Sequence, residues 1–356
     1  MNLQDLLTRH AWRPDHGVPD WMLGWFKRYS ISFADGLTDV HTHVCWLQSR
    51  NFTIDLRLPR RRDQASTAQG MALTQGRHAD IHAESWSRWA DFEGWKAPAT
   101  WDGKRLTWHQ PDAILQWHDR WPEPAILHRV GQCMIEFCDS GAYVEDWRLQ
   151  PSAPGPLIGL HLLCEQDALT GEVTHMGGGW IVCGDHAALV LGHPRPDVHR
   201  QQGMTLRDRV TGLQAQDRQA PDQLAALFDF ETSVATWNGR QHTVLWSTRP
   251  DRVGHLLCPT DGLSWVGDAG QAPDLPVSVP AHLAHLTRVR QTLEIHGREM
   301  LRHYAVDTLE PELSWGLSTP CTESGRTWMT REAQTLGRYT EVLSDAHADP
   351  LSLATS

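Results

Sequence analysis

The sequence predicts a mainly β protein whose strands pair antiparallel in barrels or sandwiches. Short runs of alternating apolar and polar residues recur over most of the chain. Turn signals separate these runs, and Asp102-Gly103 and Asn238-Gly239 are the strongest of them. Strands do not alternate regularly with helices, as a parallel sheet would require. Stretches near the C-terminus differ, because their apolar residues follow a helical spacing.

Three successive strands are predicted near the N-terminus. They cover Phe26 to Phe33, Val40 to Gln48 and Phe52 to Leu58. Ala34-Asp35-Gly36 and Ser49-Arg50-Asn51 supply the turns between them. Pro59 ends the third strand, because proline cannot donate a hydrogen bond to a sheet. A meander of this kind buries one face only if it curls over or meets a partner.

The rest of the first half continues this pattern as far as a proline-rich segment. Strands are predicted around Lys96 to Trp101, Arg105 to His109, Ala113 to Trp117, His128 to Phe137 and Ala142 to Leu149. A helical stretch is predicted near Ala72 to Ser87, after a polar loop. Pro151, Pro154 and Pro156 then mark a domain boundary. Residues 1–152 are therefore expected to form the N-terminal domain.

The second half predicts a further set of short strands. They lie at Leu157 to Glu165, Glu172 to Met176, Trp180 to Cys183, Ala187 to Gly192, Asp229 to Thr236 and Gln241 to Thr248. Gly177-Gly178-Gly179 predicts a sharp bend or a bulge, since the lysine and helix of a phosphate loop do not follow it. Arg200 to Phe228 indicates one or two helices. Residues 153–270 are expected to form the second domain.

Helical spacing marks the last part of the chain. Apolar residues from Pro280 to His303 approximate a helical stripe that Gly297 interrupts, and Arg331 to Ser344 predicts a second helix. Residues 271–356 are therefore expected to form a helical C-terminal extension. If the chain forms a homo-oligomer, we expect it to do so through this extension.

Composition disfavours several classes of function. The 356 residues carry a net charge of -11, which gives no bulk electrostatic support for binding nucleic acid. No apolar run approaches membrane-spanning length, and the N-terminus has no apolar leader segment. The seven cysteines are scattered without a CxxC pair, which suits reduced thiols in the cytoplasm. We therefore expect a soluble, cytoplasmic protein with neither nucleic acid nor membrane as a partner.

Several motifs together resemble a known family. WFKRYSISFADG and VCWLQSRNFTIDLRLP are similar to the opening of bacterial proteins with a W-L-Q…D-L-R-[IL]-P core. The similarity continues through Thr107-Trp108-His109, Ile135-Glu136, Tyr143 to Trp147, Val182 to His186 and Trp246 to Pro250. Those proteins resemble the fungal Hri-type family of kinase-interacting proteins, which folds as two lipocalin-like β-barrels in tandem. Over residues 25–258 the resemblance implies two antiparallel lipocalin-like (calycin) barrels, and it carries over no catalytic motif.

Tryptophan is unusually frequent, with 18 residues against four tyrosines and seven phenylalanines. Its wide ring fills barrel interiors and stacks on flat ligands, although any single one is more simply a large core residue. Tyr143, Glu145 and Trp147 share one strand face, while Trp46 and Trp108 lie on other strands of the same domain. An eight-stranded barrel holds one small ligand. We expect these five side chains to line a cavity with Glu145 as its main ionisable group.

Three further polar residues are candidates for the same cavity. Glu136, on the preceding strand, would act as an acid or a base if burial among tryptophans raised its pKa. The alternative is a carboxylate paired with Arg129 or Arg148. Asp55 and Arg57 share one face of their strand. They face solvent if the barrel core is solid, and they form a buried pair or orient an anion if it is hollow.

A metal-binding motif is present, but its context does not support it. Asp39-Val40-His41-Thr42-His43 matches the DxHxH signature of amidohydrolases, in which alternate histidines of one strand meet an ion. The strand–helix alternation of a TIM barrel does not follow, so two polar residues on the wetter face of a strand are the simpler interpretation. Other histidines lie on strands of the second half, at His161, His175 and His186. We expect neither a metal nor a cofactor.

Three functions remain open on the sequence alone. The first, which we favour, is the binding of a small apolar or aromatic molecule in a tryptophan-lined barrel. The second is an enzyme that uses the same cavity for acid-base dehydration, cyclisation or isomerisation, with Glu145 and Glu136 as catalytic groups. The third is an amidohydrolase-like metal hydrolase that uses His41 and His43.

Overall fold

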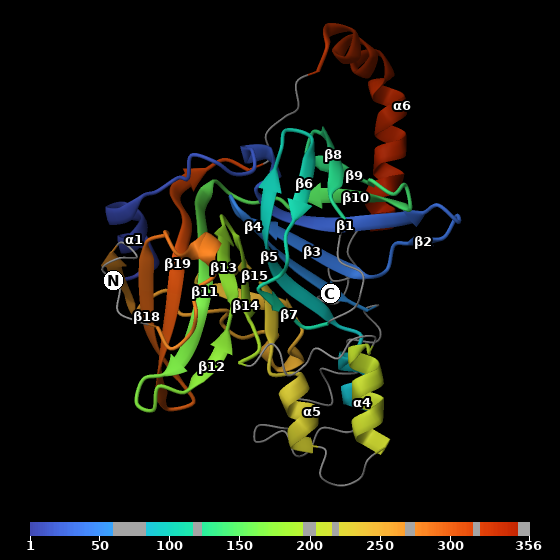
Figure 1. Cartoon of the computed structure of the whole chain (residues 1–356). Coiled ribbons are helices and arrows are strands. Elements are labelled where there is room, and N and C mark those ends of the chain that lie inside the picture. Colours follow the sequence, from blue (N-terminus) through green and yellow to red (C-terminus); the bar gives the residue numbers. More distant parts are fainter. Residues whose placement is uncertain are drawn as a thin grey trace. The chain divides into compact units, whose positions relative to one another are not determined.

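Antiparallel pairing of neighbouring strands organises most of the chain into two sheets (Figure 1). The computed structural model describes residues 1–59, 83–116, 123–194, 204–215, 221–267, 275–315 and 321–347. Met1–Leu317 forms one compact unit, which contains both sheets, and Ser318–Ser356 forms a second unit. The mainly β fold that the sequence predicts is confirmed.

Eight strands close into an antiparallel barrel. They are β1 (Gly24–Phe33), β3 (His43–Gln48), β4 (Phe52–Leu58), β5 (Glu93–Trp101), β6 (Arg105–Trp108), β8 (Ala125–Val130), β9 (Cys133–Cys138) and β10 (Tyr143–Leu149). Each strand pairs with the next in this series, and β10 pairs back with β1. Two short strands are added to it, β2 (Thr38–Asp39) on β1 and β7 (Ala113–Ile114) on β5. Closure leaves the barrel strands without a free edge.

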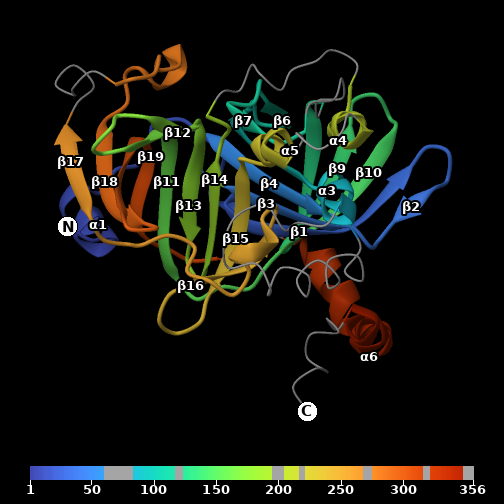
Figure 2. The ribbon, with the colours of Figure 1, turned by 90° about the horizontal axis from the view of Figure 1, so that it is seen from below.

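A second antiparallel sheet lies beside the barrel (Figure 2). Its strands are β11 (Gly155–Asp167), β12 (Val173–Met176), β13 (Gly178–Cys183), β14 (His186–Leu191), β15 (Glu231–Trp237), β16 (His242–Ser247), β17 (Leu263–Gly267), β18 (Arg288–Ile295) and β19 (Arg298–Leu313). Their order is β16-β15-β14-β13-β11-β19-β18-β17, with β12 paired to β11. Within the described residues no pairing joins β16 to β17, so the expected second barrel is not confirmed.

The packing of the two sheets determines which face of β4 points into the barrel. The aliphatic face, from Phe52 to Leu58, belongs to a core cluster that also contains Leu157, Ile181 and Val190 of the second sheet. Each fully buried aliphatic side chain contributes about 1.5–3 kcal/mol. A slip of one residue would lose that burial, so the register of β4 is fixed. The polar face of β4, which carries Asp55, is therefore turned to the barrel interior.

The helix predicted from Pro280 to His303 is wrong. The segment forms β18 and the start of β19, joined by a tight turn at His296-Gly297 with φ angles of 52° and 75°. Val289, Gln291 and Leu293 are buried while residues between them are more exposed, which is the period of a strand. β19 pairs with β11 along most of its length, so tertiary pairing overrides the helical spacing of the apolar residues.

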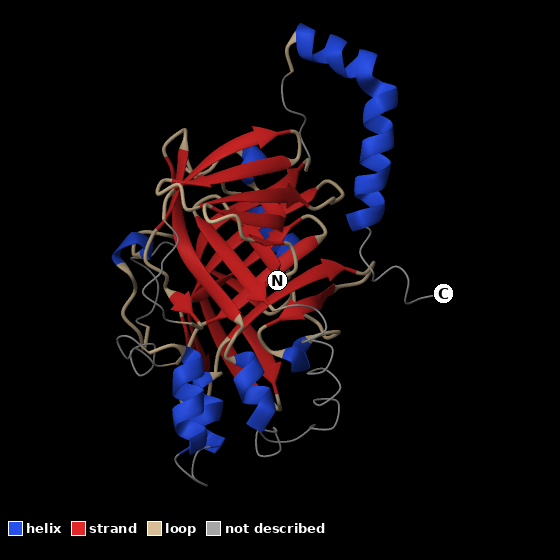
Figure 3. Ribbon diagram, turned by 90° about the vertical axis from the view of Figure 1, so that its right-hand side faces the viewer, coloured by secondary structure: helices blue, strands red, loops and turns tan. Residues whose placement is uncertain are grey.

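Helices account for little of the first unit, as Figure 3 shows. Within the described residues they are α1 (Leu3–His10), α3 (Ala83–Trp89), α4 (Leu206–Ala215) and α5 (Pro221–Leu227), with 3-10 turns η1 (Asp20–Met22), η4 (Pro250–Arg252) and η6 (Ala281–Leu283). The helices predicted between Arg200 and Phe228 and between Arg331 and Ser344 are confirmed, the latter within α6 (Glu323–His347). The stretch predicted near Ala72 to Ser87 lies largely outside the described residues. None of the described helices is long and apolar enough to cross a membrane.

Gly297→Ala is expected to destabilise the protein by about 1–2 kcal/mol, because alanine enters the left-handed region at a cost. If the segment were a helix, the same substitution would stabilise it by about 0.8–1 kcal/mol. Gly212→Ala, inside α4, is the matched control, since no neighbouring atom lies within 4 Å of the added Cβ. It is expected to be stabilising. Urea denaturation measures the change in the free energy of unfolding for both variants. A Gly297→Ala variant that is more stable than wild type would contradict the hairpin.

Candidate functional site

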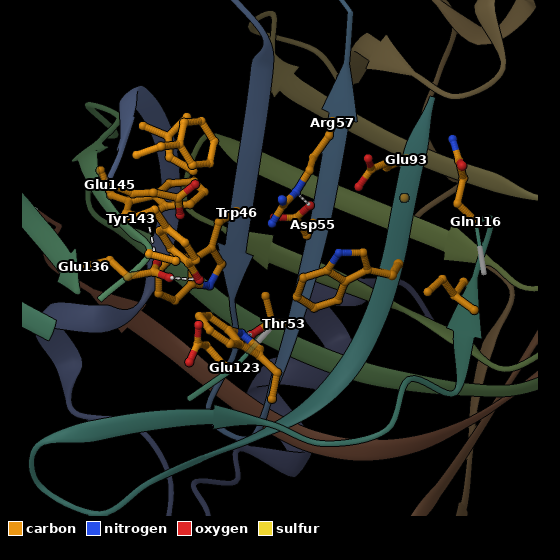
Figure 4. Close-up of a pocket in the computed structure, with 18 residues that line it drawn as sticks. Trp46, Thr53, Asp55, Arg57, Glu93, Gln116, Glu123, Glu136, Tyr143 and Glu145 are labelled. Atoms are coloured by element: carbon orange, nitrogen blue, oxygen red, sulfur yellow. Dashed lines mark hydrogen bonds and ion pairs between the residues drawn. The ribbon is translucent and has the colours of Figure 1, made fainter. Parts of the chain in front are cut away.

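A cavity of about 280 Å³ lies inside the barrel (Figure 4). All eight side chains that the sequence assigns to a ligand or catalytic site line it. They are Trp46, Asp55, Arg57, Trp108, Glu136, Tyr143, Glu145 and Trp147. They come from β3, β4, β6, β9 and β10, so closure of the barrel is what brings them together.

Strand alternation places these side chains on the inner face. Tyr143, Glu145 and Trp147 are alternate residues of β10 and therefore point the same way. Glu145 stands directly opposite Glu136 in the pairing of β10 with β9. Opposed residues of antiparallel strands have side chains on the same face, so the two carboxyl groups share one wall of the cavity.

Four tryptophans form much of the cavity wall. The ring centre of Trp46 lies 5.2 Å from that of Trp147 and 5.6 Å from that of Trp108, in edge-to-face arrangements. Trp95 completes the group at 6.4 Å from Trp108. Trp95 lies one residue before the predicted strand, which starts at Lys96, whereas β5 begins at Glu93. A strand extended towards its N-terminus would include this tryptophan.

Two of the indole N–H groups are bonded to the barrel itself. Trp46 donates to Oε1 of Gln48 at 2.9 Å, and Trp108 donates to Oγ1 of Thr53 at 3.1 Å. Thr53 in turn donates to Oε1 of Gln48 at 2.6 Å. These bonds satisfy polar atoms that would otherwise be costly to bury. The rings of both tryptophans therefore offer a ligand their apolar surface.

Glu136 is the most unusual ionisable group in the cavity. It is 2 % exposed, accepts a hydrogen bond from Trp147 Nε1 at 2.9 Å, and lies 3.4 Å from the Tyr143 hydroxyl. Burial, reinforced by the charge of Glu145, raises its pKa well above the ordinary value. It makes no ion pair among the described residues, so a neighbouring arginine does not neutralise it.

Glu145 forms an ion pair that its strand position does not predict. Its Oε1 atom lies 2.7 Å from Nη1 of Arg28, whose Nη2 atom lies 2.8 Å from Asp39. Glu145 and Arg28 are both almost fully buried. The pair joins β10 to β1 at the seam where the barrel closes. Arg28 could not be predicted from alternation along its strand, because a bulge between Arg28 and Ser30 shifts the alternation of β1.

Asp55 and Arg57 form a buried pair inside the hollow barrel. The distance from Arg57 Nε to Asp55 Oδ1 is 2.8 Å, and Asp55 is 2 % exposed. Burial raises the pKa of Asp55, and the adjacent guanidinium opposes that shift. Of the two arrangements left open by the sequence, the structure therefore has the buried one, with both residues facing the cavity.

The geometry does not support the hydrolase hypothesis. The strand predicted from Val40 begins only at His43, so His41 lies outside it and is exposed. Asp39 accepts from the backbone N–H of His41 and binds Arg28, while the ring of His43 lies 5.2 Å from that of Trp246. Among the described residues no group of three or more His, Cys, Asp or Glu side chains has a metal-binding arrangement.

The three histidines singled out in the second half serve separate contacts. His161 Nδ1 lies 2.7 Å from the ammonium group of Lys96. His175 Nδ1 lies 2.8 Å from Glu165. His186 Nε2 lies 2.8 Å from the Pro151 carbonyl oxygen. These contacts hold strands and loops together, and they do not converge on one point.

A larger depression, of about 1190 Å³, lies where the barrel meets the second sheet. Its rim includes exposed residues such as Trp12 and His109. Its floor includes Asp112 and His161, whose polar atoms already contact Lys96. The barrel cavity is smaller, but it gathers the tryptophans and the unpaired buried carboxyl group. We therefore assign the candidate site to the barrel, in which a shaped apolar wall meets a few placed polar groups.

The fold and the cavity define a β-barrel protein with an aromatic internal site. No family model, curated protein or solved structure matches the chain. The resemblance of residues 25–258 to the Hri-type family therefore stays a prediction.

Proposed function

We propose that the barrel binds a small apolar or aromatic molecule. The observation that carries this proposal is the internal cavity of about 280 Å³ with four tryptophans in its wall. Aromatic walls with a few placed polar groups are typical of sites for small molecules. The resemblance to lipocalin-like barrels supports the same function, since such barrels hold one small ligand.

Binding of N-phenyl-1-naphthylamine tests the proposal, because the emission of this neutral apolar dye rises in an apolar cavity. The dye is expected to give a saturable rise with the wild-type protein. Trp147→Phe is expected to weaken its binding by about threefold to tenfold, since a smaller ring leaves part of the wall uncovered. Trp180→Phe is the matched control, because Trp180 is equally buried but packs in the second sheet.

Two outcomes would contradict this proposal. One is the absence of a saturable rise in dye emission. The other is an equal loss of affinity in Trp147→Phe and Trp180→Phe, which would mean that the dye does not enter the barrel. Thermal denaturation of both variants shows whether each retains the folded state at the temperature of the assay.

A second candidate function is acid-base catalysis in the same cavity. The observation that favours it is Glu136, whose pKa is raised well above its ordinary value by burial and by the charge of Glu145, so that it holds a proton at a higher pH than an exposed glutamate. A buried, protonated carboxyl group beside a tyrosine hydroxyl is suited to donate a proton in a dehydration, cyclisation or isomerisation. Glu136→Gln would abolish turnover of any converted ligand, and product analysis of ligands found in a binding screen measures this.

We also propose that this function is carried out in the cytoplasm and that a homo-oligomer forms through the C-terminal segment. All seven cysteines are free thiols, and six of them are buried, which supports a reducing compartment. Trp328 and Met329 of α6 are about half exposed, which supports an apolar contact there. Size-exclusion chromatography of the full chain and of Trp328→Glu tests the oligomer.

A further inference from the structure

We infer that the molecule held in the barrel carries a positively charged nitrogen, as a protonated amine on an apolar or aromatic body. The inference rests on the proposed function of the same cavity and adds the charge of the ligand. Three features carry it: the balance of charged groups in the wall, the lack of a cation beside Glu136, and the position of Glu136 against a tryptophan.

The described wall of the cavity has more acidic than basic groups. Five carboxyl groups line it, at Asp55, Glu93, Glu123, Glu136 and Glu145. Arg57 is the single basic residue among the described lining residues, and it pairs with Asp55 at 2.8 Å. Glu145 forms an ion pair with Arg28 of β1, at a distance of 2.7 Å. An anionic ligand would add to this negative charge, and a cationic ligand would offset it.

Glu136 is the carboxyl group that is free to receive the cation. Its two contacts are neutral donors, the indole N–H of Trp147 at 2.9 Å and the hydroxyl of Tyr143 at 3.4 Å. A carboxylate has about four acceptor positions, so these donors leave room for an N–H group of a ligand. A hydrogen bond between an ammonium and a carboxylate is roughly twice as strong as a neutral one.

The tryptophans of the cavity wall also favour a ligand with a positive charge. Trp147 donates its N–H to Glu136 from the edge of its ring, so the attraction of a ring face for the ammonium would come from the other tryptophans of the wall. Trp46 is 5.2 Å away from Trp147, between centroids, and lines the same space. Cations are attracted to the face of tryptophan more strongly than to any other side-chain ring. The apolar body of the ligand would then contact the remaining rings.

The electrostatics of the empty cavity also favour a cation. Burial and the charge of Glu145 oppose ionisation of Glu136, and Arg57 on β4 favours it more weakly. Asp55, Glu93, Glu123 and Tyr143 also line the cavity, and Arg28 lies behind Glu145. A bound ammonium would lower the pKa of Glu136 by direct attraction. Uptake of the amine is therefore expected to release a proton from Glu136 at a pH below its raised pKa, while uptake of a neutral ligand is not.

The test compares 2-phenylethylamine, which is a cation at neutral pH, with 2-phenylethanol, which has the same body without the charge. Each displaces N-phenyl-1-naphthylamine from the wild-type protein. The amine is expected to bind about tenfold more tightly. In Glu136→Gln the preference is expected to fall to about twofold or less, because the amide keeps the shape of the side chain but not its charge. Glu294→Gln, an exposed position outside the cavity, removes the same charge and is expected to keep the preference.

The outcomes separate this inference from the proposed function. Equal displacement of the dye by the amine and the alcohol would overturn the inference and leave the cavity as a site for neutral molecules. A preference that survives in Glu136→Gln would also overturn it, since the charge would then be recognised elsewhere. Failure of the dye itself to bind would overturn both. Isothermal titration of the amine in buffers of different ionisation enthalpy measures the proton release independently.

Discussion

Replacing Lys96 by methionine is expected to lower the free energy of unfolding by about 3–5 kcal/mol. Lys96 is fully buried, and its ammonium group lies 2.5 Å from Oδ2 of Asp112 and 2.7 Å from Nδ1 of His161. Methionine fills most of the same volume but leaves Asp112 as a buried carboxyl group without a cation. The other oxygen of that carboxyl group already has no hydrogen-bond partner.

The effect is large because Lys96 joins the barrel to the second sheet. It extends from β5 to His161 of β11, whose other ring nitrogen lies 3.9 Å from Asp307 of β19. Asp307 accepts a hydrogen bond from Ser49 at 2.5 Å, in the turn between β3 and β4. Burial, and then the charge of Lys96, lower the pKa of His161 well below its ordinary value, so the neutral imidazole accepts from the ammonium group.

Urea denaturation of Lys96→Met, Asp112→Asn and the double variant measures this prediction. The double variant is expected to recover part of the loss, because it removes the uncompensated carboxylate. Lys104→Met is the matched control, since Lys104 is exposed in the turn between β5 and β6, and it is expected to change stability by less than about 0.5 kcal/mol. A Lys96→Met variant as stable as Lys104→Met would refute the role assigned to this residue.

Replacing Arg28 by methionine is expected to cost about 3–5 kcal/mol at neutral pH. The guanidinium group neutralises Glu145 from the side of β1, and its loss would leave that carboxyl group buried and opposite Glu136. Asp39 would lose the same partner but keep the backbone N–H groups of His41 and Thr42. The seam of the barrel would therefore carry two neighbouring buried carboxyl groups, neither of them in an ion pair.

Urea denaturation of Arg28→Met and wild type at neutral pH measures this cost. Adding Glu145→Gln is expected to restore part of the stability, because the amide has no charge to leave buried without a cation. Arg148→Met is the matched control, because Arg148 and Asp146 form an exposed pair next to the seam, worth about 1 kcal/mol or less. An Arg28→Met variant as stable as Arg148→Met would contradict the assigned ion pair.

Much of the cavity could be predicted from local sequence patterns. Tyr143, Glu145 and Trp147 alternate within one strand, and the period of a strand is fixed by its backbone geometry. The turns at Asp102-Gly103 and Asn238-Gly239 are also local, and Gly103 and Gly239 have the positive φ angles that such turns require. These features follow from short segments, and therefore the sequence alone was sufficient for them.

Other features depend on partners that lie far away in the chain. The helical spacing between Pro280 and His303 was misleading, because pairing with β11 decides the conformation of that segment. Asp55 faces the cavity because the aliphatic side of β4 packs on the second sheet. Arg28 meets Glu145 only because β1 and β10 close the barrel, and a bulge in β1 sets its direction.

The sequence by itself therefore determined the β class, the positions of most strands of the barrel and the set of aromatic and acidic side chains that share an inner face. The tertiary structure decided which carboxyl group has a cation and which does not. That distinction between Glu145 and Glu136 arises from contacts between strands that are distant in the chain. Alternation along one strand fixes the face on which a side chain lies, but the environment of that side chain is fixed by the strands that pack around it.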